Sequence, residues 1–329
     1  MKELEISKND AGQRLDRFIG KAVPLLPASL IQKYIRIKRI KVCGKGAKRD
    51  YKLAAGDTVQ LYVSDGFFDA AKHEFISTAR HADNTAYTPI PGPDIIYEDE
   101  NILLLNKKAG VLCYNSDNPD CPDLISMVKQ YLYEKNEWLP NEENCFAPAV
   151  CNRIDRNTSG IVIAAKNAES LRIINEKLRT REIDKYYLAA VHGTPEPSSG
   201  VLKGYITKNS ARNIVSVTKD YSIGAKEAHT EYKTLASSEN RSLLECRLIT
   251  GRTHQIRAQL SDFGHPILGD RKYGSSKQSG GYTGSHQALC SYKIVFSFQS
   301  DAGLLSYLKN QSYEIHDIPF AGLFEESRV

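Results

Sequence analysis

The sequence predicts an α+β fold, with a mixed, largely antiparallel sheet flanked by helices and a small αβ domain in front of it. Four apolar runs are typical of buried strands, at residues 101–106, 160–165, 186–191 and 243–249. Helical patterns separate some of these strands but not others, so the regular alternation of a parallel α/β sheet is missing. The chain has 329 residues, which suits two domains better than one.

Residues 1–64 predict the small domain, made of two helices and a hairpin. Apolar residues recur at helical spacing in two sets, Leu15, Phe18, Ile19 and Ala22, then Ile31, Tyr34 and Ile35. Ser29 and Gln32 match a capping box, which predicts Ser29 as the N-cap of the second helix. Alternating apolar residues around Ile40 and from Val59 to Val63 predict two short strands with a turn between them.

Positive charge is concentrated in this small domain. Residues 31–52 hold nine Lys or Arg against the single Asp50, while the whole chain has a net charge of only +5. Such a cluster is typical of a module that contacts phosphates. A solvated charged face is the alternative, but the interleaved apolar residues indicate a folded surface. The candidate RNA-binding side chains are Lys33, Arg36, Lys38, Arg39, Lys41 and Lys45.

The segments on either side of the larger domain are less regular. Residues 65–93 lack periodicity and end in Pro and Gly, which predicts a linker. We expect its Phe67, Phe68 and Phe75 to be anchoring contacts rather than base-stacking residues. The larger domain is expected to span residues 94–300, followed by a C-terminal extension, residues 301–329, to which the sequence assigns no role.

Helices of the larger domain can be placed from their apolar spacing and end signals. Residues 124–132 repeat apolar side chains at helical spacing, and a second helix follows Asn167, which is a good N-cap. Residues 252–262 predict a short helix that ends at Gly264, with Pro266 behind it.

Composition excludes several classes of protein. The chain lacks the apolar run of roughly 18 residues that a membrane helix needs, and its first residues do not form a signal peptide. Seven scattered cysteines without a CxxC pair indicate free thiols in a reducing compartment. Histidine spacing predicts no metal site, and phosphate-binding glycine motifs for a nucleotide cofactor are absent. We therefore expect a cytoplasmic protein without metal or cofactor.

Three polar segments stand out at the ends of apolar strands. The first, residues 152–160, holds Asp155 in a loop that leads into a buried strand, which places the carboxylate at a cleft. The second, residues 251–257, ends with Arg257 between two apolar residues, where an inward side chain needs an anionic partner. In the third, Tyr186 and Tyr187 point to opposite faces of a strand, so we expect one in the core and one at the cleft. A turn-forming Asp and a structural salt bridge are the plain alternatives.

Taken together, these segments resemble the RluA family of pseudouridine synthases. NRIDRNTSG is similar to that family's HRLDxxTSG loop, KYYLAAVHG to its KxYxAxVxG strand, and TGRTHQIRAQLSDFGHPILGDRKYG to its long TGRTHQIR segment. IIYEDENILLLNKKAGVL is similar to the start of the family's catalytic domain. The small domain, from GQRLDRFI to AAGDTVQLYV, resembles the S4 RNA-binding domain that many members carry. The resemblance covers about residues 12–63 and 94–300.

The resemblance implies roles for four residues. Asp155 matches the catalytic aspartate and Tyr187 the active-site tyrosine. Arg257 matches the arginine that pairs with the aspartate, and Arg153 an arginine used around the flipped uridine. Two positions depart from the pattern, because Asn152 stands for His and Lys108 for Pro. Neither is the reacting group, so the departures concern loop geometry and substrate choice.

The implied reaction agrees with the absence of a cofactor motif, since turning uridine into pseudouridine involves no redox change. It needs a carboxylate acting as nucleophile or as base, a buried cation beside it, and an aromatic face for a base taken out of its stack. We expect a pseudouridine synthase fold acting as a monomer on RNA, with large-subunit ribosomal RNA preferred. Transfer RNA is the alternative substrate, and a non-catalytic RNA-binding or ribosome-assembly factor is the alternative class.

Overall fold

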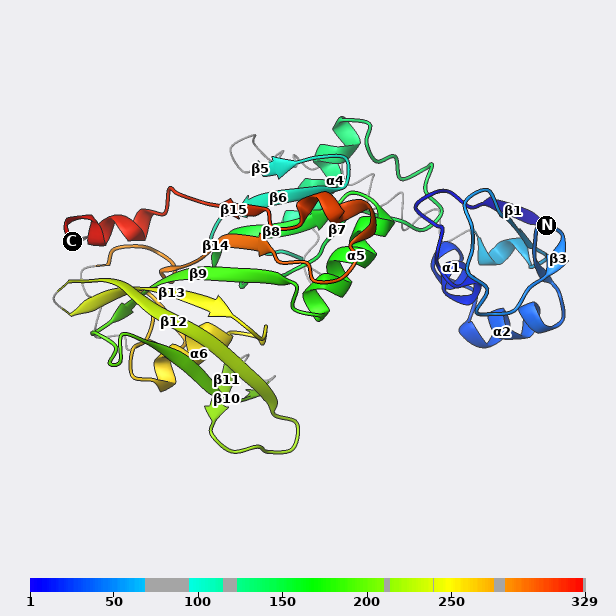
Figure 1. The fold of residues 1–329 in the computed structure, drawn as a ribbon. Helices are drawn as coiled ribbons and strands as arrows, with labels where there is room; N and C mark the ends of the chain where they lie inside the picture. The colour runs from blue at the N-terminus through cyan, green and yellow to red at the C-terminus, as the bar shows by residue number, and fades with distance from the viewer. Residues whose placement is uncertain (69–94, 115–122, 210–213, 239, 275–281, 328–329) are drawn as a thin grey trace.

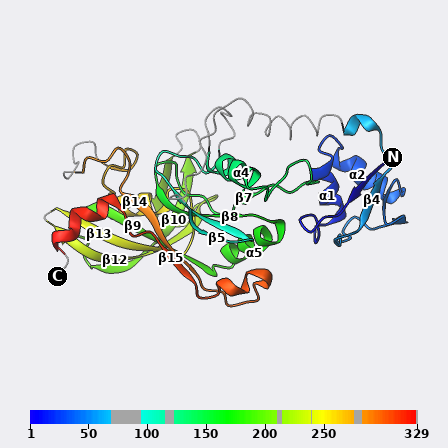
Figure 2. The same ribbon diagram turned by 90° about the horizontal axis from the view of Figure 1, so that it is seen from above.

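The computed structural model of the chain describes residues 1–68, 95–114, 123–209, 214–238, 240–274 and 282–327. A small N-terminal domain lies at one end of the molecule and a larger sheet domain occupies the rest (Figure 1). The view from above shows the same division, with the two chain termini at opposite ends (Figure 2).

The N-terminal domain packs two helices against a four-stranded antiparallel sheet. Its strands follow the order β1-β4-β2-β3. In chain order, the elements are β1 (Lys2–Glu5), α1 (Leu15–Ala22), α2 (Ala28–Arg36), β2 (Ile40–Val42), β3 (Lys45–Gly46) and β4 (Thr58–Leu61). Helix α1 buries Leu15, Phe18 and Ile19, as its apolar spacing predicts. Strand β1 was not predicted, because its residues are mostly charged and its pairing with β4 lies far away in sequence.

The start of α2 differs from the prediction. The helix begins at Ala28 with Pro27 at the N-cap position, and no side chain caps it, so the capping box at Ser29 was wrong. The fixed φ of proline already matches the entry to a helix, which lets the first turn form two residues earlier than predicted.

The two phenylalanines at the start of the expected linker are anchors. A short 3-10 helix, η1 (Asp65–Phe67), follows β4, and Phe67 and Phe68 pack against the core of the N-terminal domain. The Lys2 ammonium lies 4.5 Å from the centre of the Phe68 ring. This confirms the expectation for both residues, while Phe75 lies outside the described residues.

The larger domain is built on one extended sheet whose path runs β11-β10-β12-β13-β9-β14-β8-β6-β5, with β15 on β14 and β7 on β8. Among the described strands, β14 and β8 form the parallel pair and the other neighbours are antiparallel. The strands are β5 (Ile95–Glu98), β6 (Ile102–Lys107), β7 (Ala149–Val150), β8 (Ser159–Ala165), β9 (Ile183–His192), β10 (Ser199–Asn209), β11 (Ile214–Thr218), β12 (Lys226–Ser238), β13 (Arg241–Leu248), β14 (Leu289–Phe296) and β15 (Ser312–Glu314). This arrangement is the mixed, largely antiparallel α+β sheet that the sequence predicts.

Helices cover both faces of one half of this sheet. Leu103 and Leu105 of β6 point to α4 (Leu124–Glu134), whereas Ile102 and Leu104 point to the face of α5 (Ala168–Arg179). Because neither face meets water, β6 and β8 are continuous apolar runs rather than alternating ones. Helix α5 starts where the sequence predicts, because the Asn167 side chain caps it by accepting a hydrogen bond from the Ser170 amide.

The other half of the sheet packs against α6 (Gln255–Asp262) and the C-terminal segment. The C-terminal segment contains two 3-10 helices. The first, η3 (Gly303–Leu308), packs beside α5 on the half of the sheet already described. The second, η4 (Pro319–Ser327), places Phe320 and Phe324 against β9, β12 and β13 on the other half. In Figure 1 this segment, orange to red, runs along the sheet to the C-terminus. The residues of the expected extension thus contribute a strand and two short helices to the sheet domain.

A polar junction joins the two domains. Asp10 is fully buried, and its carboxylate accepts from the Asn144 amide at 2.7 Å and from the Cys145 thiol at 3.1 Å. Beside it, Asn9 Nδ2 donates to Glu143 at 2.6 Å, and Arg172 of α5 donates to the backbone of the N-terminal domain. Side-chain contacts therefore hold the N-terminal domain against the sheet domain in addition to the chain connection.

Candidate active site

Asp155 lies in the loop between β7 and β8, which pair with each other and so bring the ends of the loop together. The Lys107 ammonium stabilises this loop by donating hydrogen bonds to the carbonyl oxygens of Arg156, at 3.0 Å, and Val111, at 2.7 Å. Burial lowers the pKa of Lys107 to about 8. At neutral pH the group is still largely protonated and can hold the loop.

Further bonds fix both ends of the loop. The Gln287 amide donates to the Thr158 hydroxyl at 2.8 Å. Asn152, which departs from the family pattern, accepts from the Ile163 amide at 2.8 Å through its side chain. This departure therefore serves the geometry of the loop.

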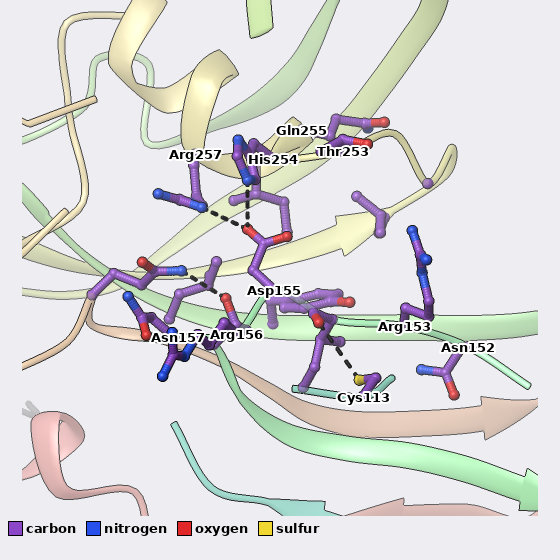
Figure 3. A pocket seen from close by; sticks show the side chains of 18 of the residues that line it. Cys113, Asn152, Arg153, Asp155, Arg156, Asn157, Thr253, His254, Gln255 and Arg257 are labelled. Carbon is purple, nitrogen blue, oxygen red and sulfur yellow. Dashed lines mark hydrogen bonds and ion pairs between the residues drawn. The ribbon is translucent and has the colours of Figure 1, made fainter. Parts of the chain in front are cut away.

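Arg257 and His254 both point to the Asp155 carboxylate from the start of α6 (Figure 3). Arg257 Nη1 lies 2.7 Å from Asp155 Oδ2, and His254 Nε2 lies 3.8 Å from the same oxygen. On its other side, Arg257 binds Asp270 with two bonds, at 2.7 and 2.9 Å. One guanidinium therefore bridges two carboxylates. The sequence pointed to Asp155 and Arg257 as a pair, but it did not single out Asp270 or His254.

The helix that carries Arg257 is shorter than predicted. It begins at Gln255 rather than at residue 252, because His254 takes the left-handed conformation with φ of 51°. This turn brings the imidazole toward Asp155, and its Nδ1 lies 2.8 Å from the hydroxyl of Tyr273. Gly264, at φ +89°, follows the last helical residues, as the end signal predicts.

Burial and neighbouring charges determine the charge states of His254 and Arg257, the two groups that approach Asp155. Burial lowers the pKa of His254 below 6.5, so the imidazole is neutral at pH 7. For Arg257, burial opposes the charged form, but hydrogen bonds and charge from Asp270 and Asp155 outweigh it and raise the pKa. The guanidinium is therefore the fixed cation beside Asp155.

Tyr187 lies on β9 and lines the same cavity as Asp155, although its side chain is only 6% exposed. Burial raises the pKa of its hydroxyl, which stays protonated. Tyr186 lies on the opposite face, half-buried, with the Lys293 ammonium 5.7 Å from its ring centre. The two rings therefore lie on opposite faces with Tyr187 at the cavity, as expected, but the expectation of a core tyrosine on the other face was wrong, because Tyr186 is only half-buried.

The cavity around Asp155 has a volume of about 1070 Å³. This exceeds the range of roughly 300–1,000 Å³ that is usual for small-molecule sites. Arg153 is exposed and lines the cavity near Asp155. Among the described residues that line it, Asp155 is the one carboxylate, and the cations are Arg153, Arg156, Lys185, Lys208, Arg252, Arg257, Arg271 and Lys272.

Sequence reasoning missed most of these cations because they come from five separate parts of the chain, with no local run of charge. The predicted basic set lies elsewhere, on the N-terminal domain. There Lys38, Arg39 and Lys41 line a shallow hollow of about 440 Å³ with Tyr62. The remaining members, Lys33, Arg36 and Lys45, are exposed. The structure therefore presents two basic surfaces where the sequence indicated one.

The described residues hold neither a candidate metal centre nor a candidate membrane-spanning helix. No group of three or more His, Cys, Asp or Glu side chains in these ranges could hold a metal ion. Of the helices in the described part of the chain, none combines the length and apolar character that crossing a membrane requires.

Comparison with known proteins gives concordant matches. A family described as RNA pseudouridylate synthase matches residues 101–262. An uncharacterized RNA pseudouridine synthase of Mycoplasma capricolum is 32% identical over 314 residues, 94% of this chain and 96% of the relative. The ribosomal large subunit pseudouridine synthase C of Escherichia coli K12 is 31% identical over 277 residues, 83% and 80% of the two chains. The solved structure of human RNA Pseudouridylate Synthase Domain Containing 4 shares the fold, with TM-score 0.54 and 21% identity over 76% of this chain and 94% of that one.

Proposed function

The chain belongs to the family of RNA pseudouridylate synthases, enzymes that isomerise uridine to pseudouridine, and from this membership we propose that its substrate is large-subunit ribosomal RNA. The names of the relatives in Escherichia coli and Vibrio support this substrate. The observation that carries the assignment of the site is the ion pair of Asp155 with Arg257 inside a large cationic cavity.

In this proposal Asp155 is the catalytic carboxylate. The reaction breaks the bond between C1′ of the ribose and N1 of the uracil, and forms a bond from C1′ to C5 after the base has turned. A proton leaves C5 and N1 gains one, so atoms and charge balance without a redox partner. An ionised carboxylate serves such a reaction as nucleophile or as base. Arg257 supplies a fixed positive charge 2.7 Å from this carboxylate.

Tyr187 and Arg153 are proposed to hold the nucleotide. A base outside the stack needs an aromatic face, and the Tyr187 ring is buried at the cavity wall beside Asp155. Taking a base out of its stack costs a few kcal/mol, and one aromatic stack returns about 1–3 kcal/mol. Arg153, exposed at the cavity, and the cations around it can offset the remainder by binding phosphates.

The N-terminal domain is proposed to bind RNA with its basic face, Lys33, Arg36, Lys38, Arg39, Lys41 and Lys45. Two basic surfaces, one here and one around Asp155, let a single chain bind two separated stretches of phosphate backbone. A large folded RNA offers such paired surfaces more readily than a short hairpin. This supports ribosomal RNA over transfer RNA as the substrate.

A cytoplasmic location and action as a monomer belong to the same proposal. The six cysteines in the described part of the chain are free thiols, in keeping with a reducing compartment.

The test is to incubate the protein with ribosomal and transfer RNA from a strain that lacks it, and to map the new pseudouridines. We expect one or a few new sites in large-subunit ribosomal RNA. Product confined to transfer RNA would overturn the substrate proposal and leave the enzyme class standing.

A further inference from the structure

Asp270 is a buried carboxylate for which the proposed reaction has no direct use. Its side chain is 0% exposed, and it binds Arg257 Nε through Oδ2 at 2.7 Å and Nη2 through Oδ1 at 2.9 Å. It does not line the cavity. Its bonds instead determine which edge of the guanidinium Arg257 presents to Asp155.

Because Asp270 occupies two nitrogens of Arg257, the contact with Asp155 is made by Nη1 alone. That bond, and the approach of His254, both go to Oδ2 of Asp155. Within the described residues, Asp155 Oδ1 receives no hydrogen bond. An arginine without a second partner prefers to bind both oxygens of a carboxylate with two parallel bonds. With Nε and Nη2 bound to Asp270, Arg257 contacts Asp155 by one bond instead of two.

We propose that Asp270 is a positioning residue that holds Arg257 to one oxygen of Asp155 and so keeps the other oxygen open to the uridine. This inference rests on the proposed catalytic role of Asp155. It adds that the charge of Arg257 is useful only in the orientation that Asp270 imposes.

Asp270 is itself rigidly placed. The backbone amides of Lys272 and Tyr273 donate to its Oδ1 at 2.9 and 3.2 Å. The preceding Gly269 has φ +73°, and a Cβ there would lie 2.7 Å from the carbonyl oxygen of His286, so the close approach of the chain next to Asp270 requires glycine.

The charge of Asp270 is also secured. Burial opposes the ionised form, but hydrogen bonds from Arg257 and from the two amides outweigh it and hold the pKa below its usual 3.8. It stays a carboxylate throughout the neutral range and cannot release Arg257 there.

The chain offers a matched control. Glu182 is also a buried carboxylate, paired with Lys177 at 2.8 Å and bound by the backbone amides of Gln299 and Ser300 at 2.8 and 3.0 Å. It does not line the cavity around Asp155. Replacing each carboxylate by its amide removes the same charge from a similar environment, and Asp270 alone is connected to Asp155.

The test compares full-length Asp270→Asn, Glu182→Gln and Asp155→Asn by single-turnover rate constant, RNA affinity and Tm. We expect Asp270→Asn to lose at least tenfold in rate, with RNA affinity within twofold of wild type, and Glu182→Gln to keep its rate. A rate for Asp270→Asn above half of wild type overturns the inference, as does an equal loss of affinity. Asp155→Asn separates the two proposals, because activity in that variant defeats the proposed catalytic role itself.

If Asp270→Asn fails to fold, Asp270→Ala with added formate takes its place. Formate supplies a carboxylate in the space that the side chain vacates, whereas formamide has the same shape without the charge. The inference predicts at least fivefold recovery with formate and none with formamide. Equal response to both compounds, or none to either, contradicts it.

Discussion

Arg257 Nη1 and Asp155 Oδ2 lie 2.7 Å apart although 102 positions separate the two residues in the chain. Asp155 comes from a loop between two paired strands, and Arg257 from the first turn of a helix on the other half of the sheet. Their meeting defines the centre of a cavity with many cations and one carboxylate.

Replacing Arg257 should separate the effect of charge from that of shape. Arg257→Ala leaves two carboxylates without their cation and should remove at least 99% of the activity, a loss of about 2.7 kcal/mol in transition-state stabilisation. Arg257→Lys keeps the charge but cannot bridge Asp155 and Asp270, so it should fall between wild type and Arg257→Ala. Single-turnover kinetics measure both. Equal activity of Arg257→Lys and wild type would show that the bridging geometry has no importance.

Two variants of Tyr187 distinguish its ring from its hydroxyl. Tyr187→Phe keeps the aromatic face at the cavity wall and should lose little. Tyr187→Ala also removes the stacking surface, worth about 1–3 kcal/mol, and should lose roughly 5- to 150-fold. Rates at saturating RNA provide the comparison. If both variants lose the same amount, the hydroxyl carries the role.

The basic face of the N-terminal domain should control how salt affects binding. The slope of log affinity against log salt is about −0.7 for each neutralised phosphate of a single strand. Changing Lys33, Arg36, Lys38, Arg39 and Lys41 to Gln should flatten this slope and leave the chemical step intact at saturating RNA. The control changes exposed Arg181 and Lys309 of the sheet domain to Gln. An unchanged slope in the first variant would mean that the cluster only faces solvent.

His254 should make the protein less stable as the pH falls. Its folded pKa is below 6.5, so under mildly acidic conditions the unfolded chain binds a proton that the folded state does not. Stability is therefore lost as pH falls below about 6.5, with a slope of at most about 1.4 kcal/mol per pH unit from this group.

The comparison variant for this effect is His254→Asn, since asparagine tolerates the left-handed backbone at this position. Urea unfolding at pH 7.0, 6.0 and 5.5 should show a smaller loss of stability in the variant. Parallel curves for the two proteins would exclude His254 as the source.

The helices and strands that were predicted correctly are determined by local features of the sequence. Strands β6 and β8 are continuous apolar runs because helices cover both of their faces, and α5 has its N-cap residue in place. Strand β1 and the start of α2 could not be placed in the same way. The first depends on pairing with β4, and at the second Pro27 outweighed a plausible serine cap.

The same contrast holds for the site. Asp155 and Arg257 stand in segments whose polar residues interrupt apolar strands, so the sequence marks them. Asp270 lies within the segment TGRTHQIRAQLSDFGHPILGDRKYG, but nothing local to it shows its partner, since its importance comes from two bonds to Arg257, 13 residues away. The cationic lining likewise has no local signal, because its members meet through the fold alone.

The most direct test of the account is the single-turnover rate of Asp155→Asn on cognate RNA. The substitution keeps the size of the side chain and its place in the loop, but removes the charge that Arg257 balances. We expect isomerisation to be abolished while RNA binding stays within a few-fold of wild type. Retention of more than about a tenth of the wild-type rate, a loss below roughly 1.4 kcal/mol, would contradict the central assignment.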